Sequence, residues 1–374
     1  MAAKSLTNRA WRLKRYPTGL PTVDDFELFA AEPPAAALSA GEVLLRTAYI
    51  SVDPYMRTRM KAGAGYLMDG FELGGKPIDG FCVAKVEQIA GAGASAGEGG
   101  LAVGDYVHGF LPWRELNVAS AAAVSRIDGA LGAADAAADG AAAATADPIS
   151  PSAYLGVLGL TGLSAYFPAL EIGQPQPGET AFVSAAAGAV GSIAGQVFKQ
   201  MGCEVYGSAG TAEKLAALRD ELGFDGALNY KVGAAELDAQ LGALCPKGID
   251  VYFDNVGGVM LDTVLKHMNT NGRIICCGAI SQYSNADDEA AYGVKNLFMV
   301  VAKQLTMRGF LLHRWQDRHA EGRAQLAQWL REGKLAHKET IVDGFDSVAE
   351  AMVSLLNGGN TGKLVVRVEQ QQQE

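Results

Sequence analysis

Residues 178–312 repeat one pattern, a short apolar strand followed by a glycine turn or a helix, and this repeat restricts the fold more than any other feature. Apolar strands are predicted at 180–184, 204–209, 249–256, 272–280 and 305–312. The apolar residues from Val190 to Met201 recur at helical spacing, and Thr211 is the expected N-cap of a helix that ends near Leu222. Strand–helix units of this size build a parallel, doubly wound sheet. The sequence therefore predicts a doubly wound α/β domain here.

The regions on either side of residues 178–312 lack this alternation of strands and helices. Residues 41–57 predict a strand closed by Asp53-Pro54, and 104–110 predict a short strand between glycines. Low-complexity stretches at 91–100 and 129–146 are interpreted as surface insertions without chemistry. The pattern changes near residue 150, which marks a domain boundary.

The C-terminal part, from about residue 313, predicts helix, turn, helix and a last strand at 363–368. It is too short to form a domain alone, so we expect it to pack back onto the N-terminal part. The predicted domains are 1–150, a β-rich first part, 151–312, the doubly wound domain, and 313–374, a return to the first domain.

Composition narrows the class of protein. The chain has 374 residues, 49% of them hydrophobic and 19% charged, which is typical of a globular protein of about two domains. Its net charge of −10 argues against a nucleic-acid partner, and no apolar run reaches the ~18 residues of a membrane span. Five cysteines form no C-x-x-C pair, which disfavours disulfides and structural zinc and suits the cytoplasm.

The N-terminus is basic, with no acidic residue before Asp24. An organelle transit peptide is one interpretation. The favoured one is an opening strand, because Trp11, Leu13 and Tyr16 alternate with the charged residues.

The segment Ala185-x-x-Gly188-x-x-Gly191 lies between a predicted strand and a predicted helix. Gly188 would let the backbone approach a pyrophosphate, Gly191 would let the helix pack closely, and the helix N-terminus would face the anion. Alanine stands where a first glycine is usual, so a tight turn without a ligand is the alternative. The complete strand–helix–strand unit favours a dinucleotide site.

The second strand ends in Ser208-Ala209-Gly210, without the acidic residue that usually binds the ribose hydroxyls of NAD. A carboxylate there would repel a 2′-phosphate, so its absence, with Lys214 nearby, favours NADP(H). Lys214 could instead be a solvated helix lysine.

A catalytic zinc would need cysteine and histidine ligands in the N-terminal half. Before residue 150 only Cys82 and His108 qualify, and neither has a partner at ligand spacing. We expect no metal site, and hence hydride transfer without a metal.

These residues resemble the zinc-independent medium-chain dehydrogenase/reductases of the prostaglandin reductase and alkenal (enone) double-bond reductase group. The resemblance spans nearly the whole chain, and its most specific motifs are DPYMR, FDNVGG with CGAIS, and the late GF-x-x-x-RW. It implies a GroES-like β-rich catalytic domain from 1–150 and 313–374 with a Rossmann NADP(H)-binding domain between them. It also implies a homodimer.

The resemblance also implies a set of cofactor contacts. Residues at the pyrophosphate would be Ala187, Gly188, Ala189, Val190 and Gly191, and those at the adenosine end Ser208, Lys214 and Tyr230. The ribose and nicotinamide would be lined by Asn255, Cys277, Gly278, Ala279, Ile280, Ser281, Gln282, Tyr283, Phe310, Leu311 and Leu312. Asn360, in the last loop, would close over the cofactor from the other domain. Each has a plainer alternative; Tyr230 could be a core aromatic residue, and Asn255 and Asn360 turn or loop residues.

The implied reaction is NADPH-dependent reduction of the carbon–carbon double bond of an α,β-unsaturated ketone or aldehyde, with hydride transfer to the β-carbon. Tyr55 is the catalytic candidate, because a phenol stacks on a flat enone and donates a hydrogen bond to its carbonyl. Its alternative is a packed aromatic residue at the end of a strand.

Some relatives have a tyrosine proposed as catalytic where this chain has Ala302. Tyr283, Tyr292, a cofactor hydroxyl or water could fill that role. Residues 284–296 would border the substrate mouth. An NADPH quinone reductase and a non-catalytic NADPH-binding protein remain alternative functions.

Overall fold

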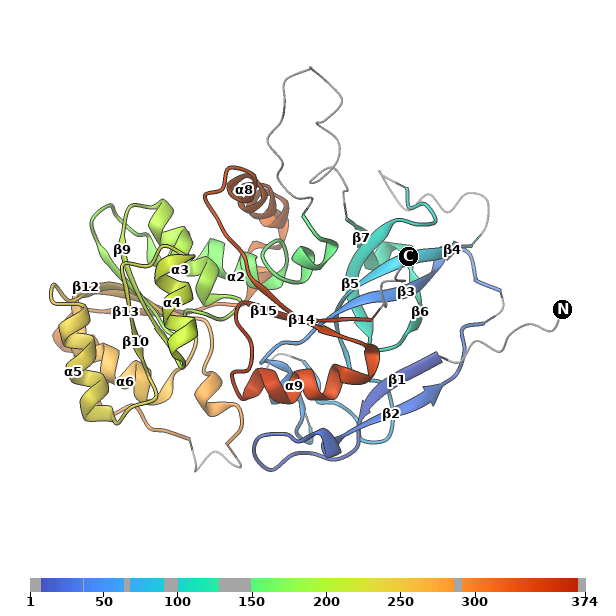
Figure 1. Ribbon diagram of the computed structural model, residues 1–374, viewed down its shortest axis with the longest axis horizontal. Helices are drawn as coiled ribbons and strands as arrows, with labels where there is room; N and C mark the ends of the chain where they lie inside the picture. Colours follow the sequence, from blue (N-terminus) through green and yellow to red (C-terminus); the bar gives the residue numbers. More distant parts are fainter. Residues whose placement is uncertain are drawn as a thin grey trace, which may run out of the picture. The chain divides into compact units, whose positions relative to one another are not determined.

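The computed structural model describes residues 8–35, 37–63, 68–90, 100–127, 149–285 and 291–368 (Figure 1). By its internal contacts the chain divides into two compact units. The first comprises Met1–Leu155, Ile341–Gly359 and Leu364–Glu374, and the second comprises Gly156–Thr340 and Asn360–Lys363. The low-complexity stretches at 91–100, except Gly100, and at 129–146 lie outside the described residues.

The second unit is built on a parallel sheet with the strand order β10-β9-β8-β11-β12-β13. The strands are β8 (Thr180–Val183), β9 (Glu204–Ala209), β10 (Gly226–Asn229), β11 (Ile249–Asp254), β12 (Met268–Cys276) and β13 (Thr306–Gly309). Counted from β8, this order is 3-2-1-4-5-6, which is that of the Rossmann fold. Successive strands are added on one side of β8 up to β10 and then on its other side from β11, so the strand order reverses between β8 and β11. Ligands of such sheets bind at the carboxyl ends of the strands at that point.

The helices of this unit are α2 (Leu160–Pro168), α3 (Gly191–Gln200), α4 (Ala212–Asp220), α5 (Ala234–Leu244), α6 (Gly258–His267), α7 (Met299–Ala302) and α8 (His319–Arg331). The predicted helical face is confirmed, since Ile193, Val197 and Phe198 of α3 are buried. Thr211 caps α4, and its side chain accepts a hydrogen bond from the Lys214 backbone N–H.

Three strands of this unit differ from the prediction, and one of them, β13, ends at Gly309, three residues before the predicted end at 312. β10 was not predicted, because four residues with two glycine or alanine positions give little apolar signal. β12 ends at Cys276 and not at residue 280, because the backbone N–H groups of Cys277 and Gly278 turn back to the carbonyl oxygen of Asp254.

The first unit is built on a sheet with the order β14-β15-β3-β4-β5-β7, in which the strands from β15 to β7 pair antiparallel, and β6 also pairs antiparallel with β3. The strands are β3 (Glu42–Ser51), β4 (Asp79–Ile89), β5 (Tyr106–Pro112), β6 (Leu116–Ser120), β7 (Val124–Arg126), β14 (Glu339–Asp343) and β15 (Lys363–Arg367). The short helix α1 (Met56–Arg59) follows β3, and α9 (Val348–Leu356) precedes β15. Trp113, Leu45 and Ile50 are fully buried in its core.

The N-terminal strand interpretation is confirmed. β1 (Asn8–Leu13) pairs antiparallel with β2 (Phe26–Ala31), and Trp11 and Leu13 are buried. The indole N–H of Trp11 donates to the Phe345 carbonyl oxygen over 2.8 Å.

The C-terminal part differs from the expectation. Ile341–Gly359 and Leu364–Glu374 cluster with the first unit, but residues 313–340 and Asn360–Lys363 cluster with the second. Packing explains the difference: Trp315 stacks on Phe167 of α2 with ring centroids 5.6 Å apart. Burying these two large rings against one another keeps this segment on the doubly wound unit.

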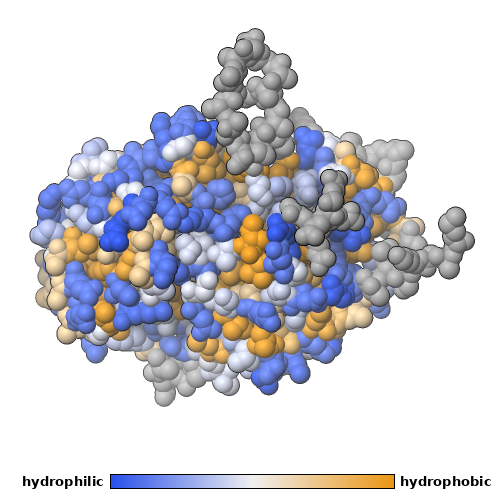
Figure 2. Space-filling view, viewed as in Figure 1, coloured by the Kyte–Doolittle hydropathy of each residue, from blue (hydrophilic) through white to orange (hydrophobic). Residues whose placement is uncertain are grey.

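The surface carries no long apolar belt in the face that Figure 2 shows; hydrophobic areas there are broken up by hydrophilic residues. Within the described residues, no helix has both the length and the apolar character that crossing a membrane requires.

Candidate functional site

The glycine turn after β8 stands at the point where the strand order reverses. Ala185 adopts a left-handed backbone conformation with φ of +48°, and its carbonyl oxygen accepts a hydrogen bond from Gly188 N–H over 3.0 Å. A Cβ atom on Gly191 would overlap that same carbonyl oxygen. Glycine at this position therefore allows α3 to begin directly above the turn, with its amino end at the carboxyl end of β8.

Gly188 has a different environment from Gly191. A Cβ atom there would meet only the Ala185 carbonyl oxygen, at 3.2 Å, and nothing else within 4 Å. The open side of Gly188 is a place where another group can approach the backbone. Small residues with exposed N–H groups at the start of a helix suit a phosphate.

The loop that contains Asn360 lies beside this turn. The backbone N–H of Gly362 donates to the Ala187 carbonyl oxygen over 2.8 Å, and Gly188 and Gly362 form a parallel bridge. The Asn360 side chain is buried, and its amide nitrogen donates to the Gly362 carbonyl oxygen over 2.7 Å. The structure thus brings predicted site residues from both ends of the second unit together. Gly362 was not predicted, although it lies only two residues after Asn360.

The end of β9 offers a polar atom without a partner. The Ser208 hydroxyl is buried and has no hydrogen-bond partner among the residues that the structure describes. A buried hydroxyl without a partner costs free energy that a bound polar group can offset. Beyond it, Gly210 lies under Tyr230, whose hydroxyl would be 2.9 Å from a Cβ atom on that glycine.

Two lysines, Lys214 and Lys231, lie near each other at this end of the sheet. Burial, and then the positive charge of Lys231, lower the pKa of Lys214 in the first turn of α4. Lys231 directly follows Tyr230 and was not predicted, because an exposed lysine after a strand has no distinctive sequence signal. Tyr230 is 42% exposed, so the alternative of a core aromatic residue is wrong.

The segment after β11 is organised by Asp254. Its carboxylate accepts hydrogen bonds from the Tyr252 hydroxyl at 2.6 Å and from the Val256 and Gly257 backbone N–H groups at 3.0 and 2.9 Å. Burial raises the pKa of Asp254. The amide nitrogen of Asn255 donates to the Ser184 carbonyl oxygen over 2.8 Å, which ties this segment to the end of β8.

The segment 277–283 follows β12 beside Asn255. The Tyr283 hydroxyl accepts a hydrogen bond from Ala279 N–H at 3.1 Å and would be 2.9 Å from a Cβ atom on Gly278. The Ser281 hydroxyl donates to the Val256 carbonyl oxygen over 2.6 Å. The predicted ribose and nicotinamide residues of these two loops therefore form one hydrogen-bonded group at neighbouring strand ends.

One side-chain oxygen joins the two ends of the following loop. Gln282 Oε1 accepts hydrogen bonds from Asn285 Nδ2 at 3.1 Å and from the Tyr292 backbone N–H at 2.8 Å. The Tyr292 hydroxyl donates to Asp262 of α6 over 2.8 Å, and Asp262 also accepts from the Asn296 N–H at 2.7 Å.

Phe310, Leu311 and Leu312 follow β13, and Leu311 is exposed. Phe310 contacts the Trp315 ring, with centroids 5.7 Å apart, and the indole N–H donates to Glu171 over 2.6 Å. Trp315 thus fixes the segment that carries Phe310. Ala302, at the place of the family tyrosine, is exposed on α7.

Tyr55 lies in the first unit, directly before α1. Its ring packs against the core, and its hydroxyl is buried without a hydrogen-bond partner. Burial, and then the negative charge of Asp53, raise its pKa above the ordinary tyrosine value. The phenol therefore keeps its proton at neutral pH and is available as a donor.

The two residues considered as metal ligands have other neighbours. Cys82 Sγ lies 3.7 Å from the Gly80 carbonyl oxygen, and the His108 ring contacts Tyr154. In the part of the chain that the structure describes, no three His, Cys, Asp or Glu residues are grouped so that they could hold a metal ion.

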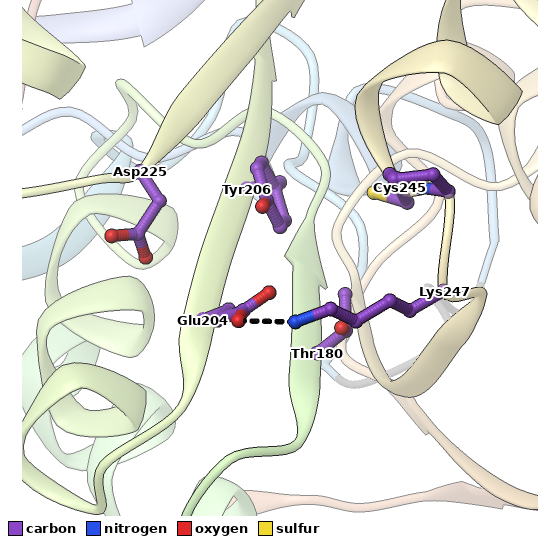
Figure 3. A pocket seen from close by; sticks show the side chains of 7 residues that line it. Thr180, Glu204, Tyr206, Asp225, Cys245 and Lys247 are labelled. Atoms are coloured by element: carbon purple, nitrogen blue, oxygen red, sulfur yellow. Dashed lines mark hydrogen bonds and ion pairs between the residues drawn. The ribbon is translucent and has the colours of Figure 1, made fainter.

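A separate cavity of about 380 Å³ opens at the other end of the parallel sheet (Figure 3). Thr180 and Glu204 line it at the amino ends of β8 and β9, and Lys247 forms an ion pair with Glu204 at 2.6 Å. The cavity lies at the opposite strand ends from the glycine turn, so it is not part of the candidate cofactor site.

The arrangement in the second unit is that of a dinucleotide-binding enzyme, and comparison with known proteins agrees. Two family models match: one described as the N-terminal domain of oxidoreductase, over residues 9–127, and one described as a zinc-binding dehydrogenase, over residues 189–329. The second range covers much of the doubly wound unit and includes neither Cys82 nor His108. The predicted fold class is confirmed.

Similar proteins extend over almost the whole chain. YfmJ of Bacillus subtilis is 42% identical, with 96% of each chain covered. The 2-alkenal reductase (NADP(+)-dependent) of Nicotiana tabacum is 36% identical over 99% of this chain and 100% of its own. A crystal structure of CurA from Vibrio vulnificus in complex with NADPH has a TM-score of 0.83, 34% identity, and coverage of 97% and 100%. The chain belongs to the zinc-independent medium-chain dehydrogenase/reductase group of prostaglandin and alkenal reductases.

Proposed function

We propose that this protein reduces the carbon–carbon double bond of α,β-unsaturated ketones and aldehydes. It is an NADP-dependent oxidoreductase of its family. The observation that carries the choice of reaction is the full-length similarity to a 2-alkenal reductase. When bound, NADPH supplies the hydride that the β-carbon of the substrate accepts.

The second unit has the features that this cofactor requires. The turn from Ala187 to Gly191 would hold the pyrophosphate, since Gly188 is open and α3 begins there. Ser208, Lys214 and Tyr230 would hold the adenosine end, where a buried hydroxyl lacks a partner and positive charge gathers. Asn255 and the segments 277–283 and 310–312 would line the ribose and nicotinamide, with Asn360 beside the turn.

Tyr55 is proposed as the donor to the substrate carbonyl. The reduction builds negative charge on that oxygen, and a hydrogen-bond donor there lowers the barrier. Two alternative tyrosines already have partners: Tyr292 donates to Asp262, and Tyr283 accepts from Ala279 N–H. The Tyr55 hydroxyl has none and keeps its proton, which supports its assignment over theirs.

The test is a steady-state screen of NADPH oxidation with short enals, long enones, conjugated diketones and quinones, with product analysis by mass spectrometry. A product gaining two hydrogens across the double bond, with the carbonyl retained, supports the proposal. Hydroquinone as the main product would show a quinone reductase instead. NADPH binding without turnover on any of them would show a non-catalytic protein.

We also propose a homodimer in the cytoplasm. β13 is the edge strand of the parallel sheet, and near it Phe298 and Val301 are 69% and 70% exposed. Large exposed apolar side chains beside an open sheet edge favour association. Light scattering after gel filtration should give twice the chain mass, and Phe298→Asp with Val301→Asp should give a monomer. Val103→Asp, equally exposed in the first unit, is the control that should leave the mass unchanged.

A further inference from the structure

Lys231 occupies a defined position at the adenosine end of the site. It is the second residue after β10, and β10 pairs in parallel with β9. The Tyr230 backbone N–H donates to the Ala209 carbonyl oxygen over 3.2 Å, and the Lys231 N–H donates to Asn229 Oδ1 over 2.9 Å. The first bond holds Tyr230 against the tip of β9, and the second fixes the turn of Lys231 at the end of β10.

The Lys231 side chain extends over that tip. Its Cε atom would be 2.9 Å from a Cβ atom on Gly210, the same distance as the Tyr230 hydroxyl. A side chain at residue 210 would therefore displace both. The end of the lysine lies beside Tyr230, which was predicted at the 2′-phosphate.

The positive charge of Lys231 acts on the neighbouring Lys214. Its pKa is lowered first by burial and then by the positive charge of Lys231. In the described part of the chain, no ion pair of Lys231 with a carboxylate is found. The two ammonium groups repel each other, and a ligand of high negative charge would relieve that repulsion. A phosphate monoester carries about −1.5 to −2 at pH 7, more than one lysine neutralises.

We propose that Lys231 is a specificity-determining residue for the cofactor, the second ammonium group that binds the 2′-phosphate. The inference rests on the cofactor site proposed above. Lys231 would contact the phosphate from the end of β10, and Lys214 would contact it from the first turn of α4, which follows β9. NADH has a hydroxyl in place of this phosphate, so it leaves the two charges uncompensated and binds more weakly.

The test uses fragments that isolate this end of the cofactor. Binding of 2′,5′-ADP and of 5′-AMP is measured by calorimetry at several salt concentrations for the wild type, Lys231→Ala and Lys231→Arg. Lys247→Ala is the matched control, an exposed lysine at the opposite end of the same sheet. Lys231→Ala should weaken 2′,5′-ADP about tenfold, because a charge-assisted hydrogen bond is lost. It should leave 5′-AMP and the thermal unfolding midpoint unchanged.

The salt dependence provides a second readout. The affinity of Lys231→Ala for 2′,5′-ADP should fall less steeply with salt than that of the wild type, and Lys231→Arg should restore most of the affinity. If the wild type prefers 2′,5′-ADP over 5′-AMP but Lys231→Ala binds 2′,5′-ADP as tightly as the wild type does, the role of Lys231 is overturned and the cofactor site stands. A wild type that does not prefer 2′,5′-ADP would overturn the cofactor site itself.

Discussion

The backbone N–H of Gly362 donates to the carbonyl oxygen of Ala187 over 2.8 Å, and this bond joins the last loop of the second unit to the glycine turn. Gly362 has a φ of +68°, and a Cβ atom there would overlap the Lys338 carbonyl oxygen. A side chain at this position would therefore push the loop away from the turn. The geometry of the turn depends on a glycine far from it in the sequence.

Gly362→Ala should lower both stability and cofactor affinity. The left-handed backbone and the overlap together should reduce the free energy of unfolding by about 3 kcal/mol. The KM for NADPH should rise about tenfold, because the displaced loop no longer supports Ala187. Gly333→Ala is the matched control, with a φ of +65° and open space around its Cβ position. It should cost about 1 kcal/mol and leave KM unchanged; equal effects of the two variants would contradict the assignment.

Substitution by alanine should mainly lower stability at Gly191 and mainly lower NADPH affinity at Gly188. Gly191→Ala overlaps the Ala185 carbonyl oxygen, so it should reduce the free energy of unfolding by about 3 kcal/mol. A Cβ atom on Gly188 would meet only the Ala185 carbonyl oxygen, at 3.2 Å, so Gly188→Ala should lose about 1 kcal/mol of stability but bind NADPH at least tenfold more weakly. Denaturant unfolding and fluorescence titration measure the two effects. Normal NADPH affinity in Gly188→Ala would show that no pyrophosphate approaches this residue.

Tyr55→Phe should separate catalysis from stability. Loss of the proposed donor should lower kcat/KM on an enone about 100-fold. The free energy of unfolding should not fall and should rise by up to about 1 kcal/mol, because the hydroxyl removed is buried without a partner. Tyr16→Phe is the opposite control: its hydroxyl donates to the Phe71 carbonyl oxygen over 3.0 Å, so it should lose stability and keep activity. Full activity of Tyr55→Phe would remove Tyr55 from the mechanism.

The cysteines should resist alkylation by enal substrates at neutral pH. Burial raises the pKa of Cys276 to about 11 and that of Cys277 to about 12. Since the thiolate is the reactive form, about one Cys276 thiol in 3,000 is reactive at pH 7.5. Because these pKa values are raised, the rate of labelling by acrolein should increase about tenfold per pH unit from 7.5 towards 10. Mass spectrometry of peptides measures it, and rapid labelling of Cys276 or Cys277 at pH 7.5 would contradict the prediction.

Much of the doubly wound unit could be predicted from the sequence. Its buried parallel strands are nearly continuous apolar runs, and α3 shows helical spacing, so β8, α3, β9 and β11 were located within about two residues. The glycine turn was found because a close backbone approach leaves small residues in fixed positions. The family resemblance implied the remaining candidate cofactor residues, and the structure brings the turn, Asn255, residues 277–283 and Asn360 to one end of the sheet.

The features that could not be predicted from the sequence depend on contacts between segments that are distant in the chain. Gly362 needs its glycine because of the Lys338 carbonyl oxygen, and no local pattern encodes that contact. Residues 313–340 join the second unit because Trp315 stacks on Phe167, a tertiary contact between two ordinary apolar residues. Lys231 could be recognised as a candidate only from the structure, because its place near Gly210 depends on the pairing of β9 with β10.

The hydrogen bonds of Gln282 have a consequence for how this protein could acquire new substrates. Its Oε1 atom holds both Asn285 and the Tyr292 N–H, while Asp262 anchors Tyr292 to α6. Gln282 thus joins Asn285 to Tyr292, and Asp262 joins Tyr292 to α6. We therefore expect residues 277–283 and 292–296 to keep their hydrogen bonds when the sequence between 285 and 292 changes. Because residues 284–296 are expected to border the substrate mouth, we propose sequence exchange between residues 285 and 292 as a route to a new substrate range.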